Sequence, residues 1–187
     1  MVDGRTGTLL TTIDTAGGHA NGLAIWGDKL YMANRDSATV SVVDIRTHAF
    51  LGTIPVGHKP WGVAAAAGRI YVANFDDGTV SVIDAERDEV TATASVADYP
   101  ALVAAWDDRA YVTHPTGILS IIAADGTLIE EIELAGAFGV AVDPAQGRVY
   151  VSNNKGHAVW VVHLSRLEVT DTIELDCLLY TSPSPRD

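Results

Sequence analysis

A four-residue motif recurs along this chain of 187 residues at an almost constant interval. Each copy begins with a tyrosine, and successive tyrosines are 40, 40 and 39 residues apart. A second apolar motif follows each copy and is clearest as VSVVD at 40–44 and VSVID at 80–84. A repeat of this length predicts one structural unit per copy. The four copies are YMAN at 31–34, YVAN at 71–74, YVTH at 111–114 and YVSN at 150–153.

Each repeat has the composition of short β-strands joined by tight turns. In the first repeat, the apolar or β-branched runs at 23–26, 29–34, 39–43 and 50–54 are typical of strands. Gly27-Asp28 separates the first two runs and favours a two-residue hairpin turn. Four antiparallel strands per unit of about 40 residues are typical of a β-propeller blade, so we predict an all-β fold. The expected blades span residues 18–56, 57–96, 97–134 and 135–175.

The repeat resembles that of the YVTN-type β-propeller family over residues 2–175. The similarity lies in the tyrosine motif, the Thr-Val-Ser-Val-Ile-Asp segment at 79–84 and the Gly-His-x-Pro-x-Gly segment at 57–62. Three features depart from the pattern: His114 replaces the asparagine, the third and fourth repeats lack the aspartate, and residues 97–100 replace Gly-His-x-Pro. The resemblance implies a bacterial or archaeal protein that is periplasmic, cell-surface or secreted, and a complete propeller that commonly has seven blades.

Both ends of the repeat region are unusual. Residues 2–18 align with 43–58, which predicts a stray outer strand at 6–14 and a chain that begins inside a blade; closure of the last blade by this strand is the alternative. Residues 177–187 resemble a translated sequencing adapter, with a natural Ser/Pro tail as the alternative, so we assign residues 1–176 to the propeller. We therefore expect about half of a larger propeller, in the form of an open arc of four blades. Its end blades would expose apolar faces, which favours self-association.

Charge and hydropathy exclude two classes of partner. The chain has 12 Lys and Arg against 24 Asp and Glu, a net charge of −12. Nucleic-acid binding requires a basic face, so we expect no nucleic-acid partner. The sequence also contains no apolar stretch long enough to span a bilayer as a helix.

The candidate binding residues lie in the loops that lead into the innermost strands, which gather at the channel mouth of a propeller. Two of them, His19 and His58, occupy equivalent positions and could either hold a metal across the channel or hydrogen-bond their own loops. Trp61, Tyr99 and Phe138 interrupt the repeat and are the strongest candidates for ligand contact. The predicted binding residues are His19, Asn21, His58, Trp61, Tyr99 and Phe138.

Residues that recur in the blades are expected to be structural. Asp44 and Asp84 begin tight turns. Asn34, Asn74 and Asn153 end second strands, where an asparagine side chain can satisfy loop backbone. The repeated tyrosines are expected to pack between blades.

Two functions remain possible. The first is a non-enzymatic binding or scaffold module that meets a protein, a glycan or a small molecule at the channel mouth, with no catalytic residues, no metal and no cofactor. The alternative is a metal-dependent hydrolase or lyase of the lactonase type. Such sites need carboxylate or amide ligands from several inner strands, and the mouth positions offer only Asn21 and Asp98 besides the histidines.

Overall fold

The computed structural model describes residues 5–9, 12–14 and 18–175. These residues form sixteen strands and no α-helix, arranged as four separate antiparallel sheets of four strands each. The predicted all-β fold with four-stranded blades is confirmed.

Within each sheet the strands follow one another in chain order, and each sheet lies inside one of the four expected ranges. The first blade contains β1 (Ala20–Trp26), β2 (Lys29–Asn34), β3 (Thr39–Asp44) and β4 (Phe50–Pro55). The second contains β5 (Pro60–Ala66), β6 (Arg69–Asn74), β7 (Thr79–Asp84) and β8 (Glu89–Ser95). The third contains β9 (Leu102–Trp106), β10 (Arg109–His114), β11 (Ile118–Ala123) and β12 (Leu128–Glu133). The fourth contains β13 (Ala137–Asp143), β14 (Arg148–Asn153), β15 (Ala158–His163) and β16 (Val169–Glu174).

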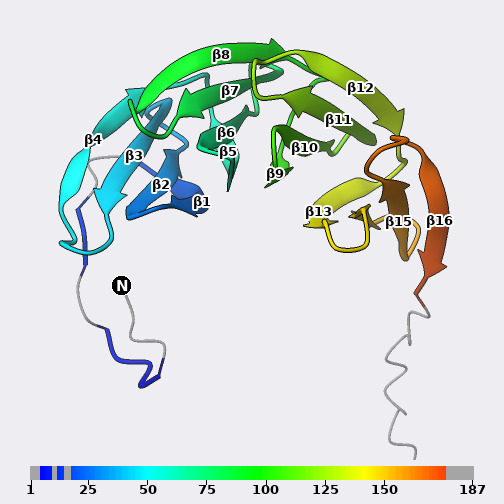
Figure 1. The fold of residues 1–187 in the computed structure, drawn as a ribbon, viewed down its shortest axis with the longest axis horizontal. Helices are drawn as coiled ribbons and strands as arrows, with labels where there is room; N and C mark the ends of the chain where they lie inside the picture. Colours follow the sequence, from blue (N-terminus) through cyan, green and yellow to red (C-terminus); the bar gives the residue numbers. More distant parts are fainter. Residues whose placement is uncertain (1–4, 10–11, 15–17, 176–187) are drawn as a thin grey trace, which may run out of the picture.

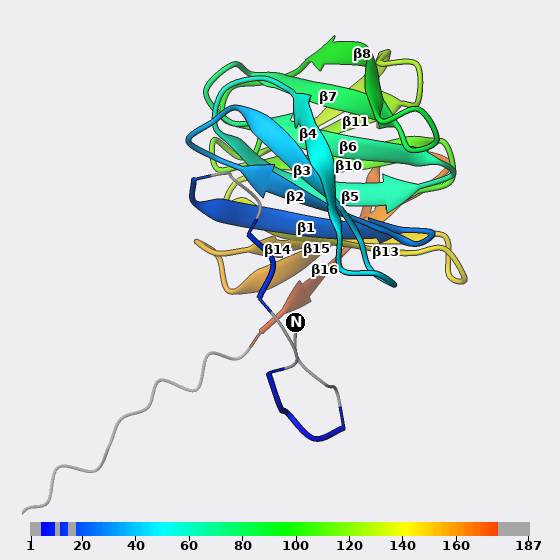
Figure 2. The same ribbon diagram turned by 90° about the vertical axis from the view of Figure 1, so that its left-hand side faces the viewer.

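The four blades stand side by side in an open arc (Figure 1). The first strand of every blade, β1, β5, β9 or β13, lies on the concave side, and the fourth strand forms the convex side. Figure 2 shows the twist of the first blade, in which the strand direction turns strongly between β1 and β4. This arrangement brings the loops at one end of every blade together around the concave side.

Apolar side chains fill the space between neighbouring blades. One buried cluster joins the first and second blades, a second joins the second and third, and a third joins the third and fourth. The inner strands approach closely because glycines stand where a side chain would collide. A Cβ on Gly22 would lie 2.5 Å from the Trp61 carbonyl oxygen, and one on Gly62 would lie 2.4 Å from that of Ala101. The Gly62 N–H instead donates a 2.9 Å hydrogen bond to the Ala101 carbonyl and ties the second blade to the third.

Three of the four repeated tyrosines, Tyr31, Tyr71 and Tyr111, lie between blades, as predicted. The Tyr31 hydroxyl donates to the Ala85 carbonyl oxygen at 3.1 Å and to Asp88 Oδ1 at 2.8 Å, both in the second blade. Tyr71 is fully buried, and its hydroxyl has no hydrogen-bond partner among the described residues. Tyr150, in the fourth blade, is only half-buried and belongs to none of the clusters between blades.

The turn aspartates are structural, as expected. Asp44 Oδ1 accepts hydrogen bonds from the N–H groups of Arg46 and Thr47, each at 2.8 Å. Asp84 does the same for its own turn and also pairs with Arg69 at 2.7 Å. Backbone hydrogen bonds hold the pKa of both carboxyls below its usual range.

The prediction for the strand-ending asparagines was wrong in the first two blades. Asn34 does not bond loop backbone; its Nδ2 donates to Thr39 Oγ1 at 3.0 Å and to Ser41 Oγ at 2.8 Å on β3. Asn74 makes the equivalent contacts in the second blade. In the fourth blade the facing strand has Ala158 and Trp160 at these positions and offers no hydroxyl.

Asn153 therefore turns to its loop and behaves as predicted. Its Oδ1 accepts from the backbone N–H groups of Lys155 and Gly156 at 3.0 and 2.7 Å.

The expected outer strand at 6–14 is not observed in the described residues. Residues 5–9 and 12–14 contain a single bridge at Leu9 and no strand, and residues 10 and 11 lie outside the description. The outer strands of the four sheets each pair with the third strand of their own blade. The adapter-like segment at 177–187 also lies outside the described residues.

Candidate functional site

All six predicted binding residues lie at one end of the blades, which we call the mouth face. It carries the loops that lead into the inner strands, 56–59, 96–101 and 134–136, and those that join second and third strands, such as 35–38 and 75–78. His19 precedes β1, and His58 and Tyr99 lie in the loops before β5 and β9. Asn21, Trp61 and Phe138 are the second residues of β1, β5 and β13.

Three aromatic rings on the mouth face form a continuous row. The ring centroids of Trp61 and Phe75 are 5.3 Å apart, and those of Phe75 and Tyr99 are 5.2 Å apart, with tilted planes in both pairs. Tyr99 is 49% exposed, while Trp61 and Phe75 are partly exposed. The Arg35 guanidinium carbon lies 5.6 Å from the Trp61 ring centroid, within the range of a cation–π contact. The row therefore crosses the first three blades, with a cation at one end and an exposed phenol at the other.

Phe75 and Arg35 were not among the predicted binding residues. They occupy the position directly after the Tyr-x-x-Asn motif, where Pro115 and Asn154 stand in the other two blades. The variation at this position is the sequence signal that could have identified them, because structural positions of the repeat keep one residue type.

The two mouth histidines each contact an aspartate of their own blade. His58 Nδ1 lies 2.9 Å from Asp77 Oδ1, and its backbone N–H donates to Asp77 Oδ2 at 2.7 Å. His19 Nδ1 makes the equivalent contact with Asp36. The backbone N–H of His58 is the largest cause that holds the pKa of Asp77 below its usual range. These contacts are the own-loop hydrogen bonds that formed one of the two interpretations of the histidines.

A pocket of about 340 Å³ lies between the first two blades on the mouth face. Beside His58 and Asp77, it is lined by Arg35 and by Lys59, whose Nζ pairs with Asp76 at 2.6 Å. Arg35 itself forms no ion pair among the described residues, and its Nε is buried without a hydrogen-bond partner there. Asp36 also lines the pocket, so Arg35 stands beside three carboxylates as the basic side chain of the lining that has no ion-pair partner among the described residues.

The structure brings only some of the predicted residues together. Trp61 and Tyr99 are joined through Phe75, and His58 lines the adjacent pocket. Phe138 is 47% exposed in the fourth blade, and no ring contact links it to the row within the described part of the chain. The Nδ2 of Asn21 is buried without a partner among those residues.

His114 takes over the position of the repeated asparagine in the third blade. Its Nε2 lies 2.9 Å from Ser120 Oγ, and its Nδ1 lies 3.0 Å from the Asp98 carbonyl oxygen. The side chain is fully buried, and this burial lowers its pKa below the ordinary value of 6.5. His114 is therefore a core residue and not part of the exposed mouth surface.

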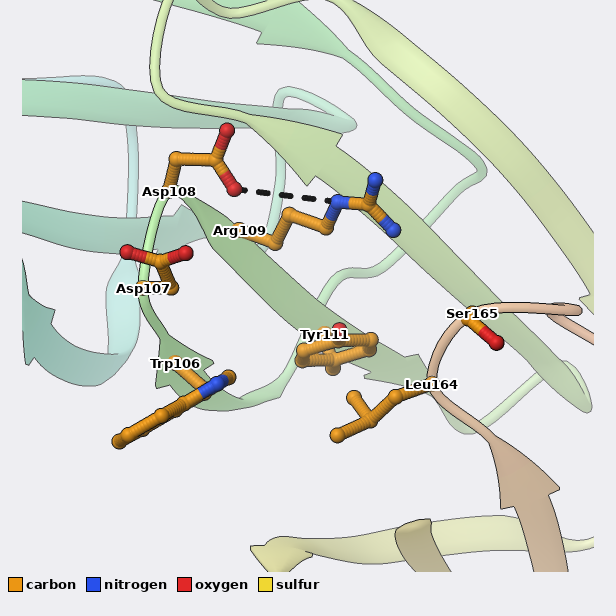
Figure 3. A pocket seen from close by; sticks show the side chains of 7 residues that line it. All are labelled: Trp106, Asp107, Asp108, Arg109, Tyr111, Leu164 and Ser165. Atoms are coloured by element: carbon orange, nitrogen blue, oxygen red, sulfur yellow. Dashed lines mark ion pairs between the residues drawn. The ribbon is translucent and has the colours of Figure 1, made fainter. Parts of the chain in front are cut away.

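The opposite end of the blades, which we call the hairpin face, carries the turns between first and second strands and between third and fourth strands. A pocket of about 270 Å³ opens there between the third and fourth blades. Figure 3 shows Tyr111 on its floor, with Asp108 and Arg109 on one side and Leu164 and Ser165 of the fourth blade on the other.

The described residues contain no group of three or more His, Cys, Asp or Glu side chains that could hold a metal ion. They also contain no helix long and apolar enough to cross a membrane.

No protein-family model and no curated protein matches the chain. Solved propeller structures resemble it at low identity. Hydrazine synthase of Kuenenia stuttgartiensis superposes with a TM-score of 0.77 at 19% identity, over 89% of this chain and 52% of that chain. The Swd1 (Cps50) β-propeller domain of Myceliophteria thermophila gives 0.75 at 12% identity, over 90% and 58%. The computationally designed Ika4 protein gives 0.73 at 15% identity, over 85% and 99%.

The chain spans little more than half of the two natural chains. Identities this low show the fold alone: the chain has a β-propeller-like fold of four blades.

Proposed function

We propose that the chain is a non-enzymatic binding module of the YVTN propeller type, which is exported and meets its ligand at the mouth face. The YVTN assignment and the export rest on the repeat motifs. The binding role rests on one observation, the row of Trp61, Phe75 and Tyr99 with Arg35 at its end.

The row has the properties of a contact surface for a ring-bearing ligand. Partly exposed aromatic rings offer apolar faces to sugar or aromatic rings, and their stiffness keeps the entropic cost of binding low. Arg35 lacks an ion-pair partner among the described residues, so its guanidinium can donate hydrogen bonds to a carboxylate or phosphate. The ligand class that fits is an acidic glycan, or a small molecule or protein segment that combines a ring with an anionic group.

No observation favours the alternative of a metal-dependent hydrolase or lyase. Three of the four mouth carboxylates that could ligate a cation already pair with basic groups: Asp36 with His19, Asp76 with Lys59 and Asp77 with His58. A cation would have to displace these contacts.

Isothermal titration calorimetry tests the proposal. The probes are glucuronate-containing oligosaccharides and neutral glucose oligosaccharides of the same length. We expect binding of the acidic series, about tenfold or more weaker in Trp61→Ala and in Tyr99→Ala. Arg35→Gln should remove the preference for the acidic series.

Asp44→Ala is the matched control, because it alters a turn remote from the row and should change stability but not affinity. Equal loss of affinity in this variant, or full affinity in Trp61→Ala, would show that the row is not the binding surface.

A further inference from the structure

Two tryptophans on the hairpin face line one apolar slot. Trp26 ends β1 in the first blade and Trp106 ends β9 in the third, and they are 39% and 48% exposed. The slot has a volume of about 370 Å³, within the usual range of small-ligand sites. Its remaining lining residues are Ala65, Ala66, Ala67, Ala105 and Asp107.

The slot exists because the second blade departs from its neighbours. Strand β5 lies between β1 and β9 on the concave side (Figure 1). Ala66 pairs with Arg69 as Trp26 pairs with Lys29 and Trp106 with Arg109, so the three residues are structurally equivalent. A small side chain in the middle position leaves a gap floored by alanines, with an indole at each side.

Charge around the slot favours a cationic occupant. The nearby bases are already paired: Lys29 with Asp88 at 2.7 Å, Arg69 with Asp84 at 2.7 Å, and Arg109 with Asp108 at 3.8 Å. In Figure 3 the indole of Trp106 lies apart from the Asp108–Arg109 pair.

Asp107 forms no ion pair among the described residues, and it supplies the one side-chain carboxylate of the slot lining. The chain as a whole carries a net charge of −12.

We propose that this slot binds the quaternary ammonium group of a small organic cation. Indole faces attract a cation placed over them, and the Asp107 carboxylate adds a long-range attraction. A primary ammonium needs several hydrogen-bond acceptors, and among the lining side chains only the Asp107 carboxylate provides them. A methylated ammonium needs none and gains from apolar walls. This site lies on the opposite face from the mouth surface and does not depend on the function proposed for that surface.

Titration of the full chain with choline, followed by NMR of the four indole N–H signals, tests the proposal. We expect the signals of Trp26 and Trp106 to shift with choline and with tetramethylammonium, while that of Trp61 stays in place. 3,3-Dimethylbutan-1-ol has the shape of choline without the charge and should bind about tenfold more weakly. A trimethyllysine tripeptide carries the same group: tighter binding of the tripeptide would indicate a protein side chain, and tighter binding of choline a free small molecule.

Variants test the tryptophans and the alanines of the slot separately. Trp106→Ala should weaken choline binding about tenfold. Ala66→Trp should abolish it by filling the gap with the residue that both neighbours carry. Phe50→Ala, an exposed aromatic residue removed from the outer strand β4, is the matched control and should bind choline as the parent does. Equal affinity for choline and its neutral analogue, or unchanged binding in Trp106→Ala, would overturn the proposal.

Discussion

Removal of one hydroxyl is predicted to have opposite effects in two successive blades. In Tyr31→Phe the chain loses the hydrogen bonds to Asp88 Oδ1 and to the Ala85 carbonyl oxygen. Both acceptor groups keep Lys29, whose Nζ lies 2.7 Å from Asp88 Oδ2 and 3.1 Å from the Ala85 oxygen. Only Asp88 Oδ1 loses its partner, and the Asp88 side chain is 28% exposed to water. The cost therefore stays near the lower end for a bond to a charged group, about 1.5–2 kcal/mol in the free energy of unfolding.

Tyr71→Phe removes a hydroxyl that is buried without a partner among the described residues. Folding desolvates this hydroxyl without a compensating hydrogen bond, so its removal should leave stability unchanged or raise it by up to about 1 kcal/mol. The ring and its packing remain the same in both variants. The predicted difference between the two substitutions is therefore about 1.5–3 kcal/mol.

Urea denaturation of the two variants at pH 7 measures this difference, and a pH series provides a second test. Burial raises the pKa of Tyr71 to about 12 from its ordinary 10.0. Between these values the unfolded chain releases the proton and the folded chain keeps it, so stability falls as pH rises through this window. The stability of Tyr71→Phe should therefore fall less than that of the parent chain as pH rises through this window. A loss of 1 kcal/mol or more in Tyr71→Phe at pH 7 would refute the reasoning, because it would mean that the hydroxyl is satisfied.

Two further predictions concern the core and the end blade. Burial lowers the pKa of His114 below 6.5, so the unfolded chain takes up the proton first and stability should fall as pH drops below that value. His114→Asn introduces the residue of the other blades and should lessen this fall, as measured by urea denaturation at pH 5.5 and 7.5. An identical pH dependence in the variant and the parent would contradict the assignment. Leu23 and Ile25 are 56% and 59% exposed on β1, whereas Val63, equivalent to Leu23, is buried against the first blade. We expect light scattering to show concentration-dependent self-association of the chain, and less of it in Leu23→Lys. A monodisperse parent chain would show that the exposed apolar side chains of β1 do not mediate self-association.

The repeat predicts the fold because residues of the same type make the same contacts in successive blades. Tyr31 and Tyr71 meet the following blade from one position of the second strand, and Asp44 and Asp84 accept the same two turn N–H groups. Such contacts are local in the sequence or recur with the repeat, so they can be predicted from the spacing of residue types. The twist and the close approach at Gly62 follow from general strand geometry and from one missing Cβ.

The contacts of the asparagines were not predictable from their own repeat position. Whether the side chain bonds a loop or a strand depends on what the facing strand offers. Asn34 meets two hydroxyls, while Asn153 meets Ala158 and finds its loop instead. The side-chain partner is set by register between strands, which the sequence of a single strand does not contain.

Only one of the two candidate surfaces could be predicted from the sequence, because the criterion for a candidate residue was that it interrupts the repeat. Trp61 and Tyr99 were predicted because they interrupt the repeat, and the same criterion applied to the residue after the motif would have added Phe75. Trp26 and Trp106 recur at one position and so resemble structural residues. They become a candidate site only because Ala66 separates them in space. In a propeller, a small residue can mark a site when the equivalent positions of both neighbouring blades carry large residues. Such a residue is recognised only after the blades have been placed side by side.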